Sequence, residues 1–263
     1  MKYSSEFYRY RGDGTTASGE PARTNGERGQ YIADTELVIA VNTALAVEQP
    51  LLVTGEAGTG KTALAYSIAA ELELGDIELF TVRSDQRGRE LLYQIDNMQR
   101  FFDAQIQDER ASDRHNYLEL GPLGRAFQSD RPRLVLIDEI DKAPRDFPND
   151  LLHSLDKMEL VIQELDMEPI KARHRPVVVI TSNRESQLPK PFLRRCVFHH
   201  IEAPDEERLG LILAERLSHL DLDQRLREHI IKAFLRIRQL DELEKKPATG
   251  ELLAWARVLH RAG

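Results

Sequence analysis

Residues 51–72 read LLVTGEAGTGKTALAYSIAAEL, and 55–62 within them fit the pattern G-x-x-x-x-G-K-[ST] at each fixed position. The apolar residues 51–53 predict a buried strand, and residues 62–72 predict a helix. Glycines let the backbone bend so that its N–H groups point inward at an anion, and the N-terminus of the helix adds partial positive charge. We therefore interpret the run as a phosphate-binding loop rather than a chance glycine-rich turn.

The pattern also assigns tasks within the loop. Lys61 is expected to reach the β- and γ-phosphates of a nucleotide, and the Thr62 hydroxyl is expected to ligate Mg²⁺. The residues expected to surround the phosphates are Gly55, Glu56, Ala57, Gly58, Thr59, Gly60, Lys61, Thr62 and Ala63.

A second acidic element follows at residues 134–139, LVLIDE. Four apolar residues in a row suit a strand of a parallel sheet that is buried on both faces, and open α/β sheets bind ligands at the carboxyl ends of their strands. Asp138 is expected to hold Mg²⁺ through a water. Glu139 is expected to orient and deprotonate an attacking water, with Asp141 as the next candidate base. A structural alternative makes Asp138 a helix cap.

Further candidates lie near the ends of other predicted elements. A strand at 176–183 ends in Asn183, which would hold the γ-phosphate or the attacking water, although an Asn after a strand is also a common turn residue. Arg194 and Arg195 are either a solvated pair or an arginine finger, which stabilises charge on a transferring phosphoryl group. Tyr31 and Ile32 precede a predicted helix and either pack on adenine or belong to the core.

Composition limits the class of protein. The chain has 263 residues and a net charge of −8, from 36 Lys+Arg against 44 Asp+Glu, which disfavours indiscriminate binding of nucleic acid. Cys196 is the one cysteine, so no internal disulfide is possible and a reducing, cytoplasmic location is expected. No apolar run approaches about 18 residues, so we expect no membrane span.

The chain divides into three parts by composition. Residues 1–30 are poor in apolar side chains and predict a solvated, flexible arm. Residues 31–203 alternate predicted strands and helices, including one amphipathic helix over 88–102, an exposed loop or helix end over 103–116 and a hairpin over 159–172. Residues 204–263 predict helices over about 205–219, 222–239 and 248–262.

Taken in order, the motifs GEAGTGKT, LVLIDE, TSN and LPKPFLRR, followed by a helical segment, resemble those of AAA+ ATPases. The stretches YIADTELVIAVNTAL, GPLGRAF, DEIDKAPRDFPNDLLHSLD, FLRRCVFHHI and KPATGELLAW resemble the MoxR-type branch. The resemblance covers about residues 31–262.

This resemblance implies a Rossmann-like P-loop NTPase core with a five-stranded parallel sheet, a small helical lid, and ATP with Mg²⁺ between them. It implies a homo-oligomeric ring, usually a hexamer, whose sites are completed by the neighbouring subunit. By motif position Asn183 matches sensor 1, and Arg195, then Arg194, match the finger. Sensor 2 has no match, because the last helix begins Thr249-Gly250-Glu251 and Arg257 lies further along.

The expected function is hydrolysis of the β–γ bond of ATP, coupled to remodelling of a client protein. MoxR-type ATPases are often paired with a protein that carries a von Willebrand A domain, and the resemblance implies such a partner. A phosphotransferase, a motor or loader acting on nucleic acid, and a slow ATP-dependent switch or scaffold are the alternatives. The acidic charge makes nucleic acid a poor partner.

Overall fold

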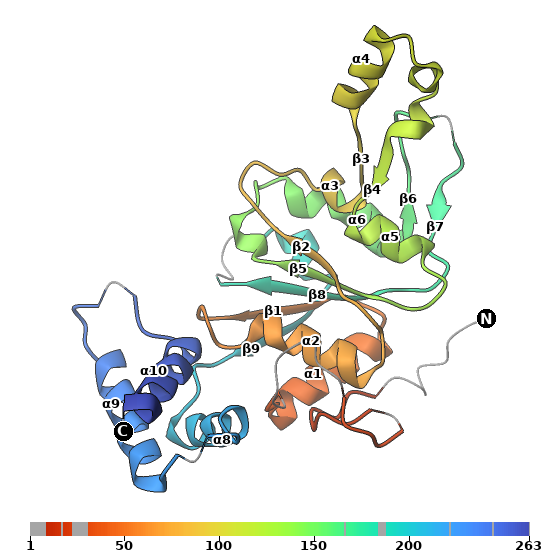
Figure 1. The fold of residues 1–263 in the computed structure, drawn as a ribbon. Coiled ribbons are helices and arrows are strands. Elements are labelled where there is room, and N and C mark those ends of the chain that lie inside the picture. Colours follow the sequence, from red (N-terminus) through yellow and green to blue (C-terminus); the bar gives the residue numbers. More distant parts are fainter. Residues whose placement is uncertain are drawn as a thin grey trace.

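A sheet of five parallel strands, in the order β2-β5-β8-β1-β9, forms the centre of the molecule (Figure 1). The computed structural model describes residues 9–16, 18–22, 31–165, 167–183, 188–220, 222–243 and 245–262. In chain order the sheet strands are β1 (Leu51–Gly55), β2 (Glu78–Thr81), β5 (Leu134–Asp138), β8 (Val177–Ser182) and β9 (Val197–Ile201). The predicted α/β class and parallel sheet are confirmed.

Both faces of this sheet are apolar. In β5, Val135 and Ile137 belong to one hydrophobic cluster, while Leu134 and Leu136 belong to the other. Successive side chains of a strand point to opposite faces, so a strand covered on both sides reads as an unbroken apolar run. This explains why residues 134–137 are recognisable in the sequence as a buried strand.

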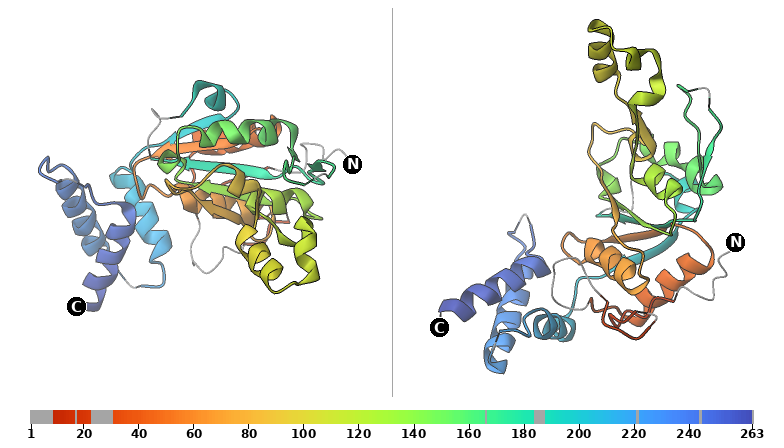
Figure 2. Two further views of the ribbon diagram at one scale, coloured as in Figure 1. Left: turned by 90° about the horizontal axis from the view of Figure 1, so that it is seen from above. Right: turned by 45° about the vertical axis from the view of Figure 1, so that its right-hand side comes forward.

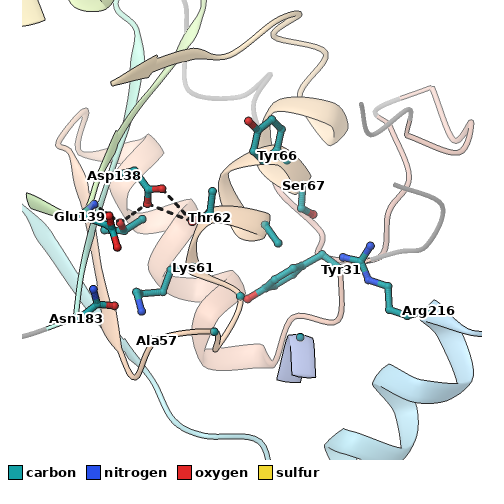
Figure 3. Close-up of a pocket in the computed structure, with 15 residues that line it drawn as sticks. Tyr31, Ala57, Lys61, Thr62, Tyr66, Ser67, Asp138, Glu139, Asn183 and Arg216 are labelled. Atoms are coloured by element: carbon teal, nitrogen blue, oxygen red, sulfur yellow. Dashed lines mark hydrogen bonds between the residues drawn. The ribbon is translucent and has the colours of Figure 1, made fainter. Parts of the chain in front are cut away.

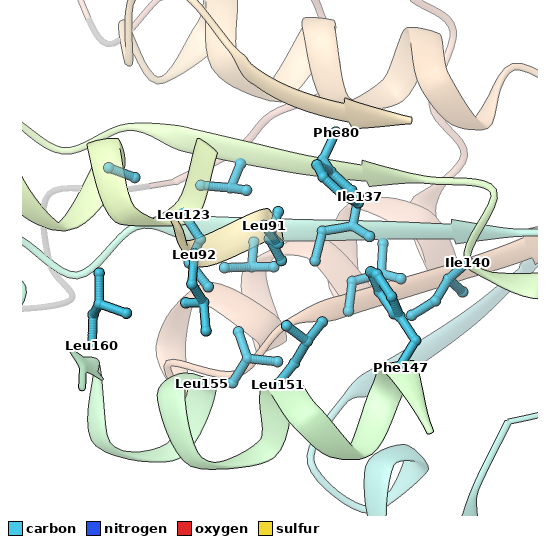
Figure 4. Close-up of a cluster of buried hydrophobic side chains, with 14 of the residues drawn as sticks. Phe80, Leu91, Leu92, Leu123, Ile137, Ile140, Phe147, Leu151, Leu155 and Leu160 are labelled. Atoms are coloured by element: carbon cyan, nitrogen blue, oxygen red, sulfur yellow. The ribbon is translucent and has the colours of Figure 1, made fainter. Parts of the chain in front are cut away.

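Helices cover each face of the sheet. The helices α1 (Thr35–Ala46) and α2 (Lys61–Glu71) pack on one face. The other face is covered by α3 (Arg89–Leu92), α5 (Pro122–Gln128) and α6 (Phe147–Lys157), whose leucine and phenylalanine side chains meet those of the strands (Figure 4). Each such side chain stabilises the fold by about 1.5–3 kcal/mol when it is fully buried. The packed core therefore holds in position the strand ends that carry the polar residues.

The single helix predicted over 88–102 is wrong. The chain instead forms α3, then β3 (Tyr93–Ile95), α4 (Asn97–Gln105), two short 3₁₀ turns η1 (Glu109–Ser112) and η2 (Arg114–Tyr117), and β4 (Leu118–Leu120), which pairs antiparallel with β3. The part from β3 to β4 projects away from the sheet (Figure 2). Leu91 and Leu92 of α3 are buried, whereas Phe101 and Phe102 of α4 are more than half exposed. The apolar spacing over 88–102 therefore predicted one helix where the chain forms two, and only α3 packs in the core.

Shorter elements complete the described part of the α/β region. The predicted hairpin over 159–172 is confirmed as the antiparallel pair β6 (Glu159–Leu160) and β7 (Ile170–Lys171). A 3₁₀ turn η3 (Ile140–Lys142) follows β5, and α7 (Lys190–Leu193) precedes β9. The turn η3 fixes where the chain leaves the carboxyl end of β5.

Three helices follow β9 in the described part of the chain, and they have a hydrophobic cluster of their own. They are α8 (Glu206–Arg216), α9 (Gln224–Arg238) and α10 (Thr249–Ala262), close to the predicted bounds. The Asp205 carboxylate caps α8 by accepting from the Arg208 N–H at 2.8 Å. These helices lie beside the carboxyl ends of the sheet strands (Figure 1).

The N-terminal arm packs on α1 and α2 where the structure describes it. Tyr10 is fully buried and shares a hydrogen bond of 3.0 Å with the Ser67 hydroxyl. Backbone N–H groups of residues 11, 12 and 14 donate to the buried Glu71 carboxylate at 2.9–3.0 Å. The prediction of a solvated arm is therefore wrong around Tyr10, while 1–8, 17 and 23–30 lie outside the described residues. None of the helices described is long and apolar enough to cross a bilayer.

Candidate functional site

The loop between β1 and α2 depends on glycine at two positions. Gly60 has φ +93° and precedes the first residue of α2, and Gly58 has φ +79°. A side chain is strained in either conformation. A Cβ on Gly58 would also lie 2.3 Å from the Cβ of Ala248, which precedes α10. The loop sequence is therefore set both by its own turn and by the close approach of the C-terminal helices.

Lys61 turns back into this loop. Its ammonium donates to the carbonyl oxygens of Gly55 and Glu56, both at 2.8 Å, and its side chain is almost fully buried. Burial lowers the pKa of Lys61, and the carboxylates of Asp141 and Asp138 oppose that shift. An arriving anion would therefore exchange two carbonyl partners of Lys61 for a full negative charge, a stronger partner for an ammonium.

A second group of oxygens is centred on Asp138, at the carboxyl end of β5. The Thr62 hydroxyl donates to the two Asp138 carboxylate oxygens at 3.2 and 3.3 Å, and the Thr181 hydroxyl donates to Asp138 at 2.6 Å. The Glu139 N–H donates to the same Thr181 hydroxyl at 2.9 Å. Three chain segments, at the ends of β5 and β8 and the start of α2, are thus connected through one carboxylate (Figure 3).

Glu139 has a special backbone conformation. Its φ is +61° and ψ +48°, in the left-handed region that costs about 1–3 kcal/mol for a residue other than glycine. Its carboxylate pairs with the Lys142 ammonium at 2.5 Å, and this bond raises the pKa of Lys142. The turn that directs Glu139 toward the cavity is fixed by the bond to Thr181 described above.

Asn183 stands at the end of β8, and its N–H donates to the Asp141 carboxylate at 2.9 Å. Its side chain faces the same space as Lys61 (Figure 3). Asp141, the alternative base in the sequence, therefore holds the β8 end in position.

The cavity that these groups line has a volume of about 690 Å³, within the usual range for small-molecule sites. Tyr31 and Arg216 lie at the end away from Asp138 (Figure 3). Burial raises the pKa of the Tyr31 phenol to about 12, so its ring is neutral. The described residues that line the cavity are Tyr31, Ala57, Gly58, Gly60, Lys61, Thr62, Ala63, Tyr66, Ser67, Asp138, Glu139, Thr181, Asn183, Arg216 and Gly250.

A sequence profile of the family described as "ATPase family associated with various cellular activities (AAA)" matches residues 51–204, more than half of the chain. The chain belongs to the AAA ATPase family. Membership implies that this AAA protein binds a nucleotide together with a divalent metal ion.

Among solved structures, the AAA protein is similar to the crystal structure of the FIGL-1 AAA domain in complex with ADP. The identity is 16%, the TM-score 0.45, and the match covers 81% of this chain and 61% of that chain, so this chain spans about three fifths of that neighbour's length. A search of curated proteins found no match.

Several predicted residues of the AAA protein do not line the cavity. Ile32 instead accepts a hydrogen bond of 3.2 Å on its carbonyl from Arg208 of α8. The Arg195 guanidinium pairs with Asp156 at 2.7 Å, and it donates to the Pro191 carbonyl at 3.0 Å. Arg194 follows α7 and Arg257 is exposed on α10. Among the other loop candidates, Gly55 and Glu56 accept from Lys61 on their carbonyls, and the Thr59 hydroxyl donates to the Glu56 carbonyl at 2.9 Å.

The AAA protein also has lining residues that sequence reasoning missed. Thr181 was visible only as part of the polar triplet after a strand, and nothing local marked it as a partner of Asp138. Arg216 comes from α8 and reaches the Tyr31 end of the cavity, while Gly250 is the residue of α10 that lines it. No local pattern predicts either contact, because both depend on how the C-terminal helices sit on the sheet.

Proposed function

We propose that this AAA protein binds ATP with Mg²⁺ in the cavity and hydrolyses its β–γ bond with water. The observation that carries the proposal is the convergence of Lys61, Asp138, Glu139 and Asn183 on one cavity from three chain segments. The role that we propose for each site residue is given below. Residues 31–203 would be the ATPase core and 204–263 the lid domain, with ATP between them.

Lys61 would release its two loop carbonyls and bind the β- and γ-phosphates, while the backbone N–H groups of Gly58 to Ala63 surround them. The neighbouring oxygens of Thr62 and Asp138 fit Mg²⁺, which prefers hard oxygen ligands and is usually held by one or two carboxylates plus substrate phosphates. The ion would supply charge that neutralises the phosphates. Tyr31 would pack on the adenine, with Arg216 beside it.

Glu139 would accept the proton of the attacking water, because its carboxylate faces the cavity and is about one third exposed. The Lys142 ammonium is bound to this carboxylate at 2.5 Å, so the pair must separate before Glu139 can accept a proton. Asn183 would hold the water or the γ-phosphate from the side of β8. Catalysis would then come from positioning of the water and stabilisation of charge on the phosphoryl group.

AAA domains typically assemble into rings, and we propose a homo-oligomeric, hexameric ring for this chain. Arg195 would act on the neighbour's site as the finger, exchanging Asp156 for the phosphoryl group. The output would be movement of the lid against the core that remodels a partner protein in the manner of MoxR-type ATPases, with a von Willebrand A protein as the partner class.

A slow ATP-dependent switch is the second candidate. The Lys142–Glu139 pair and the absence of an arginine from Thr249-Gly250-Glu251 favour it over a fast motor. In a switch, Lys142→Ala would raise turnover by freeing Glu139. In an ATPase whose Lys142–Glu139 pair opens when ATP binds, Lys142→Ala would keep turnover within about twofold of the wild type.

Calorimetric titration with ATP and Mg²⁺ tests the binding half of the proposal. Lys61→Ala removes the main positive side chain facing the phosphates and should abolish measurable binding. Lys232→Ala, an exposed lysine on α9, is the matched control and should bind normally. Unchanged affinity in Lys61→Ala would overturn the assignment of the phosphate loop.

A further inference from the structure

Arg238, the last residue of α9, reaches from the C-terminal helices to the phosphate loop. Its guanidinium donates to the Glu56 carboxylate at 2.6 Å, and only 16% of its side chain is exposed, against 53% for Glu56. It also donates to the Pro247 carbonyl, and its Cζ lies 5.9 Å from the ring centre of Phe234. A guanidinium within about 6 Å of an aromatic face is attracted to it, so Arg238 is held on three sides.

Glu56 is connected to the site through its backbone. Its carbonyl accepts from the Lys61 ammonium at 2.8 Å and from the Thr59 hydroxyl at 2.9 Å. Two residues further on, Gly58 lies directly against Ala248. The end of α9 and the residue before α10 thus both meet the phosphate loop, Arg238 through an ion pair with Glu56 and Ala248 through an apolar contact with Gly58.

The charge of Glu56 is unfavourable for the proposed ligand. A loop that surrounds a triphosphate gains from positive charge, whereas Glu56 adds a carboxylate to the same loop. The carboxylates of Asp138, Glu139 and Asp141 already act on Lys61 from the far side. Arg238 offsets the nearest extra negative charge, and it does so from a helix outside the α/β core.

We propose that Arg238 is a positioning residue that neutralises Glu56 and so keeps the phosphate loop receptive to a triphosphate. This rests on the proposed function, ATP binding at the loop. Because the same ion pair joins α9 to the loop, it also makes the position of the C-terminal helices depend on the state of the loop. Arg238 acts through Glu56 and does not itself touch the phosphates.

A double-mutant cycle on ATP affinity, measured by calorimetry with Mg²⁺, tests the proposal. Arg238→Gln keeps most of the side-chain stem over Phe234 and removes the charge, and it should weaken ATP binding by about 5–10-fold. Glu56→Gln alone should bind ATP more tightly than the wild type, because it removes a carboxylate from the loop that surrounds the triphosphate. The variant carrying both changes should return to within about twofold of the wild type, because no unpaired carboxylate remains.

Arg236→Gln is the matched control, since Arg236 is an exposed cation on the same helix, and its affinity should not change. A double variant as weak as Arg238→Gln would overturn the proposal, because Arg238 would then act on the phosphates or through the fold of the helices. Unchanged affinity in Arg238→Gln would also overturn it and reduce the pair to an ordinary surface contact. A wild type that does not bind ATP would instead overturn the proposed function, and this inference with it.

Discussion

Removing the Tyr10 side chain should destabilise the whole fold, although Tyr10 lies in an arm that the sequence suggests is solvated. The ring is fully buried against α1 and α2, and truncating a buried aromatic residue to alanine costs about 3–5 kcal/mol. Burial raises the pKa of the Tyr10 phenol far above its usual range, so its hydroxyl stays protonated beside Ser67. Tyr10→Phe loses only that hydrogen bond, about 1 kcal/mol.

The assay is urea unfolding of the full chain, followed by circular dichroism. The change in the free energy of unfolding is taken from the shift in the urea midpoint at a constant m-value. Arg9→Ala, a neighbouring exposed residue, is the control and should change the free energy of unfolding by less than about 0.5 kcal/mol. Native-state hydrogen exchange adds a local measurement, because the N–H groups of residues 11, 12 and 14 bound to Glu71 should be protected. A change below 0.5 kcal/mol in Tyr10→Ala, together with unprotected N–H groups there, would refute the reasoning.

Three further predictions concern the site and its surroundings. Gly58→Ala should weaken nucleotide binding at least ~10-fold in calorimetry, because alanine is strained at φ +79° and its Cβ would collide with Ala248. Normal affinity would show that the C-terminal helices do not pack on the loop. Arg195→Ala should keep nucleotide binding and lose up to ~10³-fold in the rate of hydrolysis. Mixing this variant with Glu139→Gln subunits should restore some activity. Mixed rings that are verified by mass and stay inactive would exclude a finger acting between subunits. Partial burial raises the pKa of the Cys196 thiol to about 12, so iodoacetamide should leave it unmodified in the native protein at pH 8 and react after unfolding. Modification without unfolding would contradict this raised pKa.

The parts of the structure that the sequence predicted are those determined by neighbouring residues. The loop around Lys61 needs glycines and a following helix within a few residues, and the apolar run before Asp138 needs only a sheet covered on both faces. The short antiparallel pair of β6 and β7 likewise follows from local alternation.

The error over residues 88–102 arose where polar side-chain contacts, and not the apolar pattern, decide which side of a helix faces inward. Asp103 of α4 is buried and accepts from the Tyr117 hydroxyl at 2.7 Å and from the Gln99 side chain at 2.8 Å, which holds the polar side of α4 inward and leaves Phe101 and Phe102 outside. A periodicity argument assumes that the apolar side faces the core, so it merged α3 with α4.

The pair of Arg238 with Glu56 shows the same limit at the site. The two residues are 182 positions apart, and neither has a local pattern that marks it as a partner of the other. Tyr10 and Glu71 are similar, since a short polar segment gives no sign that a carboxylate on α2 binds its backbone. Sequence reasoning therefore gave the chemical groups of the cavity, while the contacts that hold the cavity together required the fold.

Release of inorganic phosphate from ATP and Mg²⁺ by the purified chain, with no added acceptor, tests the central claim most directly. The wild type should release phosphate. Glu139→Gln should bind ATP with similar affinity but release phosphate at least ~10²-fold more slowly, because the amide keeps the shape of the carboxylate and lacks its basicity. A Glu139→Gln protein that turns over at the wild-type rate, or a wild type that binds ATP and releases no phosphate, would contradict the account.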